Sequence, residues 1–269
     1  MYNAMHTQKP THIRIKIGET GPQFLERTGL DDKNVNRQPA GVNFYELDWS
    51  PQKPGTVHLQ HGQHSIDFPH ALGVMGSEDL SHPHEGIDSF WISAGITATD
   101  LIAHDEARQL FTQLLQKLLK AGWKQSLAYD DPRLSGEEAY QYAVEENMGF
   151  GLPVDYAPTL EQWMAVDGTW YLYADGLFIK INIRRDSDRM DPQAPGAYLL
   201  SFTIQSKEAE AKQYFEGSQR EQWQSLWVEK IKGMKRDRYA KEKALAAQGY
   251  NINTGYQEPK IHPADPVEP

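Results

Sequence analysis

The stretch DEARQLFTQLLQKLLKAGW, from Asp105 to Trp123, has a regular apolar spacing. Its apolar residues recur every three or four positions, which places them on one face of an α-helix. They are Ala107, Leu110, Phe111, Leu114, Leu115, Leu118 and Leu119. Acidic residues begin the stretch and lysines end it, which is the arrangement that the helix dipole favours. Gly122 follows, and glycine often ends a helix. We therefore predict a helix over residues 105–122 that buries one face against a sheet.

Strand patterns surround this helix. We predict strands for GIDSFWISAG (86–95) and WKQSLAY (123–129), which lie on either side of it. Further strands are predicted at residues 11–17, 42–49, 56–61, 170–173, 177–184 and 197–205. The turn sequence SPQKPG predicts a hairpin between 42–49 and 56–61, and Asp175-Gly176 predicts a second hairpin. Residues 69–86, rich in His, Gly and Pro, are predicted to be an exposed loop.

The elements together predict an α+β fold with mostly antiparallel sheet backed by two amphipathic helices, at 105–122 and 219–235. A strand followed by an amphipathic helix occurs near 90–119 and again near 198–234, which favours two similar lobes. Capping boxes at Ser135 and Thr159 predict two more helices. We expect a flexible start at 1–9, one domain at 10–250 with an internal boundary near 130–137, and an extended tail at 251–269.

Composition excludes several classes of function. The chain has 269 residues, a formal net charge of −10, 11% aromatic residues and no cysteine. This length permits a full core, and the aromatic content is typical of a globular protein. The negative charge argues against nucleic acid or an anionic membrane as the main partner. Without cysteine there is no disulfide, Cys-ligated zinc or thiol catalysis.

Two segments resemble parts of metal sites. HEGID at 84–88 is similar to a zinc-protease helix, but Asp88 stands where the second histidine belongs and Gly86 interrupts it. DSDRMD at 186–191 spaces carboxylates like part of a calcium loop, without the central glycine or the closing glutamate. We favour solvated loop residues in both segments, and we expect neither a metal nor a cofactor.

No catalytic motif is complete. The chain contains no G-x-S-x-G elbow, phosphate-binding loop or dinucleotide fingerprint. The basic run KIKGMKRDRYAKEK (230–243) includes acidic residues, which predicts a solvated helix face and not a phosphate site. We therefore predict that the protein is not an enzyme.

Several segments in the second half of the chain carry a family resemblance. They are ITATDLIAHDEARQLFTQLLQKLLKAGWK (96–124), PTLEQW (158–163), WYLYADGLFIKINIRR (170–185), REQWQSLWVEKIKGMKRDRYAKE (220–242) and PKIHPADPVEP (259–269). Together they resemble periplasmic lipoproteins encoded beside effectors of type VI secretion systems. Such proteins are immunity partners, often of phospholipase-type antibacterial toxins.

The resemblance implies a protein that binds a cognate effector and covers its active site with polar loops. It also implies a periplasmic location and a lipid anchor, and the absence of cysteine fits a chain trimmed just after a lipidated N-terminal Cys. Two alternatives remain. A periplasmic small-ligand binding module needs a deep aromatic pocket with convergent polar groups. A hydrolase needs a perturbed His/Ser or carboxylate pair.

An immunity protein would bind its effector through loops that combine charge with exposed apolar anchors. Three loops meet this description: 76–86, 145–156 and 185–195. Their candidate interface residues are Glu78, Asp79, Glu85, Glu146, Met148, Phe150, Asp155, Tyr156, Asp186 and Asp188. We rank 145–156 first, because Phe150 lies between two glycines and has no periodic partner.

Overall fold

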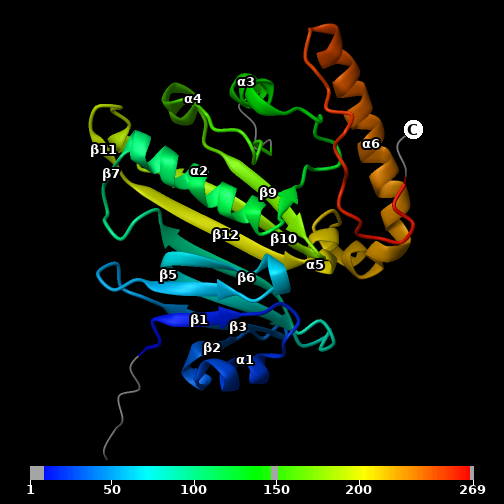
Figure 1. Cartoon of the computed structure of the whole chain (residues 1–269). Coiled ribbons are helices and arrows are strands. Elements are labelled where there is room, and N and C mark those ends of the chain that lie inside the picture. Colours follow the sequence, from blue (N-terminus) through cyan, green and yellow to red (C-terminus); the bar gives the residue numbers. More distant parts are fainter. Residues whose placement is uncertain (1–8, 147–150, 267–269) are drawn as a thin grey trace, which may run out of the picture.

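The computed structural model describes residues 9–146 and 151–266, and a ten-stranded sheet runs through this part of the chain (Figure 1). Its main path is β1 (His12–Ile15), β4 (Gly55–Leu59), β5 (Ile66–Asp79), β6 (Ile87–Gly95), β12 (Tyr198–Ser206), β10 (Leu177–Arg185), β9 (Thr169–Ala174) and β8 (Lys124–Gln125). β3 (Val42–Asp48) also pairs with β5, and β2 (Val35–Arg37) pairs with β3. These pairs are antiparallel, apart from β1 with β4. The predicted α+β class is confirmed.

The predicted central helix is α2 (His104–Lys120), which crosses one face of the sheet (Figure 1). Phe111 packs 4.5 Å from the ring of Trp170 on β9 and 5.6 Å from Trp163 on α4 (Leu160–Ala165). Leu115 and Leu118, one and two helical turns further on, are 3% and 0% exposed. Burying each such side chain contributes about 2 kcal/mol, so packing on the sheet determines where this helix lies.

α1 (Gly21–Thr28) packs against the sheet through its buried Phe24. Thr20 begins the helix with a capping box, in which its side chain and that of Gln23 bind each other's backbone N–H groups. Phe24 then packs between Tyr45 of β3 and Phe90 of β6. These contacts fix α1 against the sheet.

The other predicted helices also form. α4 follows the capping box of Thr159 with Gln162, and α3 (Gly136–Glu146) follows Ser135. Glu138 does more than its place in a capping box suggests, since its two carboxylate oxygens accept hydrogen bonds from the backbone and side-chain nitrogens of Asn251. This contact joins α3 to the C-terminal segment.

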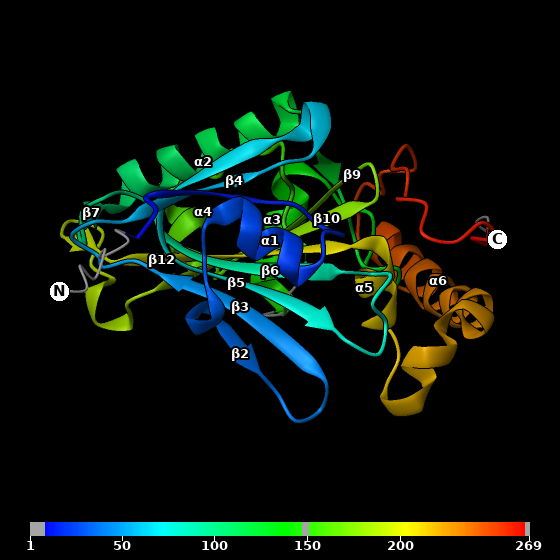
Figure 2. The same ribbon diagram turned by 90° about the horizontal axis from the view of Figure 1, so that it is seen from below.

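Three helical elements lie at one end of the sheet (Figure 2): α5 (Lys207–Lys212), η4 (Gly217–Gln222) and α6 (Trp223–Ala247). They bury a second hydrophobic cluster against Phe178 of β10, with Trp227 and Ile231 of α6 both 0% exposed. The helix predicted at 219–235 is confirmed on its apolar face, and it continues to Ala247. The remaining short elements are η1 (Asp32–Asn34), η2 (Gly62–His64), η3 (Ser187–Arg189), β7 (Ile102–Ala103) and β11 (Pro195–Gly196).

The hairpin predicted for β3 and β4 is wrong. Both strands pair with the same edge of β5, β3 with residues 73–79 and β4 with residues 66–71. The SPQKPG turn forms, with Lys53 N donating to Ser50 O, but it joins two strands that follow one another along β5. The loop predicted at 69–86 is present only at residues 80–86, because β5 extends to Asp79. Of the strand predicted at 123–129, only Lys124–Gln125 forms.

The C-terminal segment is not an extended tail in its described part. Ile261 is 4% exposed in the second cluster, and Asp265 accepts hydrogen bonds from Trp227 Nε1 and from the backbone of Ile261. The basic run is likewise not a fully solvated helix face, since Lys235 and Arg238 are 6% and 2% exposed. The segment after α6 covers these cations and completes the core.

Candidate functional site

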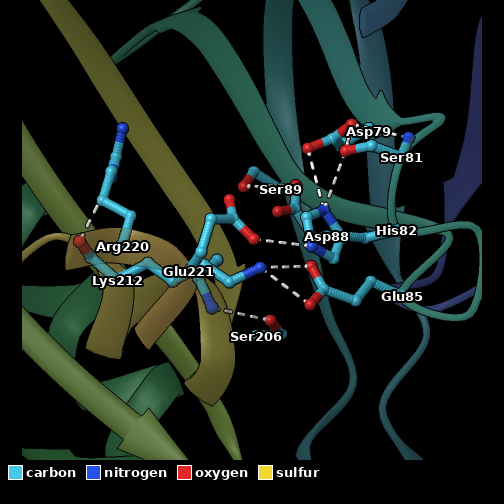
Figure 3. A network of polar contacts seen from close by, with 11 residues as sticks. Asp79, Ser81, His82, Glu85, Asp88, Ser89, Ser206, Lys212, Arg220 and Glu221 are labelled. Carbon is cyan, nitrogen blue, oxygen red and sulfur yellow. Dashed lines mark hydrogen bonds and ion pairs between the residues drawn. The ribbon is translucent and has the colours of Figure 1, made fainter. Parts of the chain in front are cut away.

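The loop between β5 and β6 carries a network of ionisable side chains (Figure 3). Asp79 accepts hydrogen bonds from the backbone and hydroxyl of Ser81, at 2.8 and 2.6 Å, and from His82 Nδ1 at 3.1 Å. The second ring nitrogen of His82 lies 2.9 Å from a carboxylate oxygen of Glu221 on η4. The hydrogen bond with Asp79 is the main reason that the pKa of His82 is raised, and Glu221 adds to it. The raised pKa favours the protonated form of His82, in which the ring links the loop to η4.

A second ion pair holds the other end of this loop. Lys212 of α5 donates to both carboxylate oxygens of Glu85, at 2.7 Å each (Figure 3). Arg220 Nε donates to the backbone carbonyl of Lys212 at 3.2 Å. Beside this pair, burial raises the pKa of Asp88, which accepts a hydrogen bond from Ser89. The loop is thus held to α5 and η4 at two points.

Leu80 precedes these two anchors in the chain and is 52% exposed. An exposed leucine on a segment that is already ordered can contact a partner without first losing chain entropy. This combination makes residues 79–86 the best-defined of the three predicted binding loops. Asp79 and Glu85 are present there, although each is already engaged by a neighbour in this chain.

Glu78 is not placed as an interface residue would be. It is 5% exposed, and its carboxylate accepts hydrogen bonds from Gly21 N and from the hydroxyl of Tyr45. Burial, aided by the bond with Glu78, raises the pKa of Tyr45 to about 12. Glu78 belongs to β5 and faces α1, so its role is to satisfy the first turn of that helix. The sequence did not reveal this, because Glu78 was predicted to lie in a loop and lies in β5.

The loop ranked first is described only in part. Met148 and Phe150 lie outside the described residues, and so does the side chain of Glu146. Asp155 is exposed. Tyr156 is half-buried, packs 5.4 Å from the ring of Tyr140 and donates from its hydroxyl to Gln162 at 3.0 Å. Its contacts hold the end of the loop to α3 and α4.

The third predicted loop borders a hollow of about 360 Å³. Asp186 lines this hollow, begins η3 by accepting a hydrogen bond from Asp188 N, and pairs with Arg189 at 3.3 Å. Asp188 is exposed. The other polar residues that line the hollow are His70, Thr97, Thr99, Asp100, Arg184, Arg185 and Tyr198. His70 has a φ of 57°, a backbone strain that is often found at functional sites.

His82 and Glu85, which lie beside and within the HEGID segment, have partners other than a metal. His82 is occupied by Asp79 and Glu221, and Glu85 by Lys212. His64 is 9% exposed and contacts the ring of Trp123. Among the described residues, no group of three or more histidine or carboxylate side chains is arranged to hold a metal ion.

Two features with functional character were missed. Trp91 is 37% exposed on β6, although the alternation of FWIS, with Phe90 and Ile92 inward, already indicated that it points outward. Asp131 has a pKa raised to about 6, chiefly by burial and then by the neighbouring charge of Asp130. No sequence pattern could reveal this shift. Asp131 is not among the residues that line the hollows beside Asp186 and Trp91.

Among the described residues, no helix is both long and apolar enough to cross a membrane. Comparison of the chain with known protein families, with characterised proteins and with solved structures found no match.

Proposed function

We propose that this protein is the periplasmic immunity partner of a type VI secretion effector, and that it neutralises a phospholipase-type toxin by binding it. The family assignment rests on the sequence resemblance. The structural observation that favours a binding role is Leu80, which is 52% exposed on a loop held by the His82–Glu221 and Glu85–Lys212 ion pairs. A pre-ordered apolar anchor surrounded by charge is typical of a protein interface.

Capture experiments test this proposal. The purified chain is immobilised and exposed to purified candidate effectors of the phospholipase type, and enzymatic inhibition is measured with the captured effector. We expect stoichiometric capture and loss of lipase activity. Failure to bind any such effector, or binding without inhibition, would contradict the proposed function.

The anchor itself is tested by Leu80→Asp, with Tyr239→Asp as the matched control. Tyr239 is 59% exposed on α6, so both variants place a charge at an exposed apolar position. We expect Leu80→Asp to weaken capture at least about tenfold, as for a hot-spot residue, while Tyr239→Asp binds like the wild type. Equal behaviour of the two variants would remove this loop from the interface.

A second candidate function, binding of a small polar ligand, is favoured by the hollow of about 360 Å³ beside Asp186. Arg184 lines it and is exposed, and within the described chain its guanidinium has no ion-pair or hydrogen-bond partner. Native mass spectrometry of protein purified from its host periplasm tests this function. A co-purifying small molecule that is lost in Arg184→Gln would support it, and an unliganded protein would argue against it.

A further inference from the structure

The sheet face turned away from α2 exposes one tryptophan. Trp91 is 37% exposed at the middle of β6, whereas each of the other six tryptophans of the chain is at most 8% exposed. Its neighbours along the strand, Phe90 and Ile92, point to the opposite face and are 0% and 1% exposed. An exposed tryptophan offers a partner a large apolar face, and tryptophan is enriched at interfaces.

The strand register places Trp91 beside acidic side chains. Trp91 pairs with Met75 of β5, and Met75 pairs in turn with Glu46 of β3. Asp48 lies two residues beyond Glu46, on the same face. A Cβ atom on Gly73 would lie 2.8 Å from Asp48 Oδ1, so the glycine allows this carboxylate to lie over β5 toward β6. These groups line a hollow of about 200 Å³, which we call the Trp91 hollow.

The two carboxylates of the Trp91 hollow lack partners. Within the described part of the chain, neither Glu46 nor Asp48 makes an ion pair or a side-chain hydrogen bond through its carboxylate; only their backbone carbonyls accept, from Asn34 and Lys9. On the same face, Lys180 is two strands away from Trp91, with its ammonium 5.6 Å from the centre of the Tyr171 ring. The hollow therefore combines one aromatic face with two available negative charges.

We propose that the Trp91 hollow binds an arginine side chain from a basic segment of a partner protein. The guanidinium stacks on the indole ring while its N–H groups donate to Glu46 and Asp48, and Met75 contacts the aliphatic stem. Cation–π stacking and charge-assisted hydrogen bonds both favour this cation, and the planar guanidinium can make both kinds of contact at once, unlike an ammonium. Only the identity of the partner, the effector, rests on the proposed function.

This site extends the binding surface beyond the predicted loops. The hollow beside Asp186 is lined by Arg184, Leu199 and Gly95, which stand in neighbouring register on the same face of β10, β12 and β6. Ser93, two residues from Gly95, lines the Trp91 hollow. The two hollows thus follow one another along a single sheet face, and a partner seated over Trp91 also reaches the loop that contains Asp186 and Asp188.

The test uses a short glycine-serine peptide that contains two arginines and the same peptide with glutamines in their place. Because Trp91 is the exposed tryptophan, acrylamide quenching of intrinsic fluorescence reports its coverage. We expect the arginine peptide to reduce the accessible fraction of fluorescence and the glutamine peptide to leave it unchanged. Equal protection by both peptides, or by neither, would overturn the proposal.

Matched variants separate specific binding from general attraction to a chain of charge −10. Glu46→Gln/Asp48→Asn should weaken binding of the arginine peptide, measured by calorimetry, at least about tenfold. Glu26→Gln/Asp237→Asn removes two exposed carboxylates elsewhere and should change affinity less than about twofold. Equal losses in the two double variants would overturn the proposal, and equal melting temperatures exclude misfolding as the cause.

The same variants distinguish this proposal from the proposed function. If wild-type protein captures an effector and Glu46→Gln/Asp48→Asn captures it equally well, the Trp91 hollow is not the arginine site of that complex, and the immunity function stands. If the arginine peptide binds as expected but no effector is captured, the hollow stands and the immunity function fails.

Discussion

The ammonium of Lys235 lies 2.6 Å from the carboxylate of Glu258. Lys235 is on α6, whereas Glu258 belongs to the segment that follows the helix. Arg238, one turn further along α6, donates to the same carboxylate, and the two cations are 7% and 2% exposed. One glutamate therefore pairs with two buried cations and holds the C-terminal segment against the helix.

Glu258→Gln should lower the free energy of unfolding by about 3–5 kcal/mol, because removing one member of a buried ionic group leaves the remaining charges uncompensated. Urea denaturation followed by fluorescence measures this change. Glu229→Gln is the control, since it removes the exposed pair with Lys232 on the same helix, where a loss of no more than about 1 kcal/mol is expected. Similar midpoints for the two variants would contradict the role given to Glu258.

Leu115→Ala should lower the free energy of unfolding by about 2–5 kcal/mol, through lost burial and the cavity that remains. Leu115 is 3% exposed between α2 and the sheet. Leu114 is only half-buried on the same helix, so Leu114→Ala should cost clearly less. Thermal unfolding of the two variants provides the comparison, and an equal cost would mean that α2 does not bury the face described.

The sequence predicted α2, the face that it buries and the Asp175-Gly176 hairpin, because each depends on residues that are close together in the chain. Asp175 and Gly176 have φ values of 44° and 82°, as a tight hairpin turn requires. The sharing of β5 by β3 and β4 escaped prediction, since a turn sequence fixes the turn and not the strand that pairs beside it. The packing of the C-terminal segment was missed because charge pairing between distant residues leaves no periodic pattern.

Only part of the candidate site could be predicted from the sequence. The charge and exposure of Asp155 and Asp188 follow from local composition, whereas the burial of Glu78 depends on α1, more than fifty positions away in the chain. The exposure of Trp91 could have been predicted, because side chains alternate between the two faces along β6 and those of Phe90 and Ile92 point inward. Its acidic neighbours come from β3, and only the register of the sheet brings them together.

The ion pair of His82 should make the 79–86 loop more firmly held in mildly acidic solution. The pKa of His82 is raised from 6.5 by Asp79, with smaller contributions from Glu221 and Glu85 that outweigh Lys212. Burial opposes the charge of Asp79, but hydrogen bonds from Ser81 and His82 lower its pKa below 3.8. A raised histidine pKa contributes stability that is complete below pH 6.5 and lost as pH rises through the folded value. A lowered aspartate pKa contributes stability above pH 3.8.

NMR titration of the His82 ring measures this effect. In Asp79→Asn the pKa should move toward 6.5, and hydrogen exchange in the loop should become faster at pH 6 than in the wild type. Glu221→Gln should produce a smaller change in the same direction, because it is the weaker contributor. An unchanged titration in Asp79→Asn would show that the pair does not form in solution.

Asp131→Asn should stabilise the protein above pH 6 and have little effect near pH 4. Burial, followed by the charge of Asp130, raises the pKa of Asp131 to about 6 in the folded state, against 3.8 ordinarily. Ionisation therefore opposes folding: the penalty is absent below pH 3.8, grows as pH rises and is complete above the folded pKa. The difference between the two values corresponds to a gain of at most about 3 kcal/mol at pH 8. Asparagine keeps an oxygen that can still accept the hydrogen bond from the backbone of Gly151.

Denaturant midpoints of wild type and the Asp131→Asn variant at pH 4.5 and pH 8 give the comparison. Asp130→Asn, which removes the neighbouring charge but leaves Asp131 ionisable, should give a smaller gain. If the Asp131→Asn variant is no more stable than the wild type at pH 8, Asp131 is solvated when it ionises and its pKa is not raised by burial.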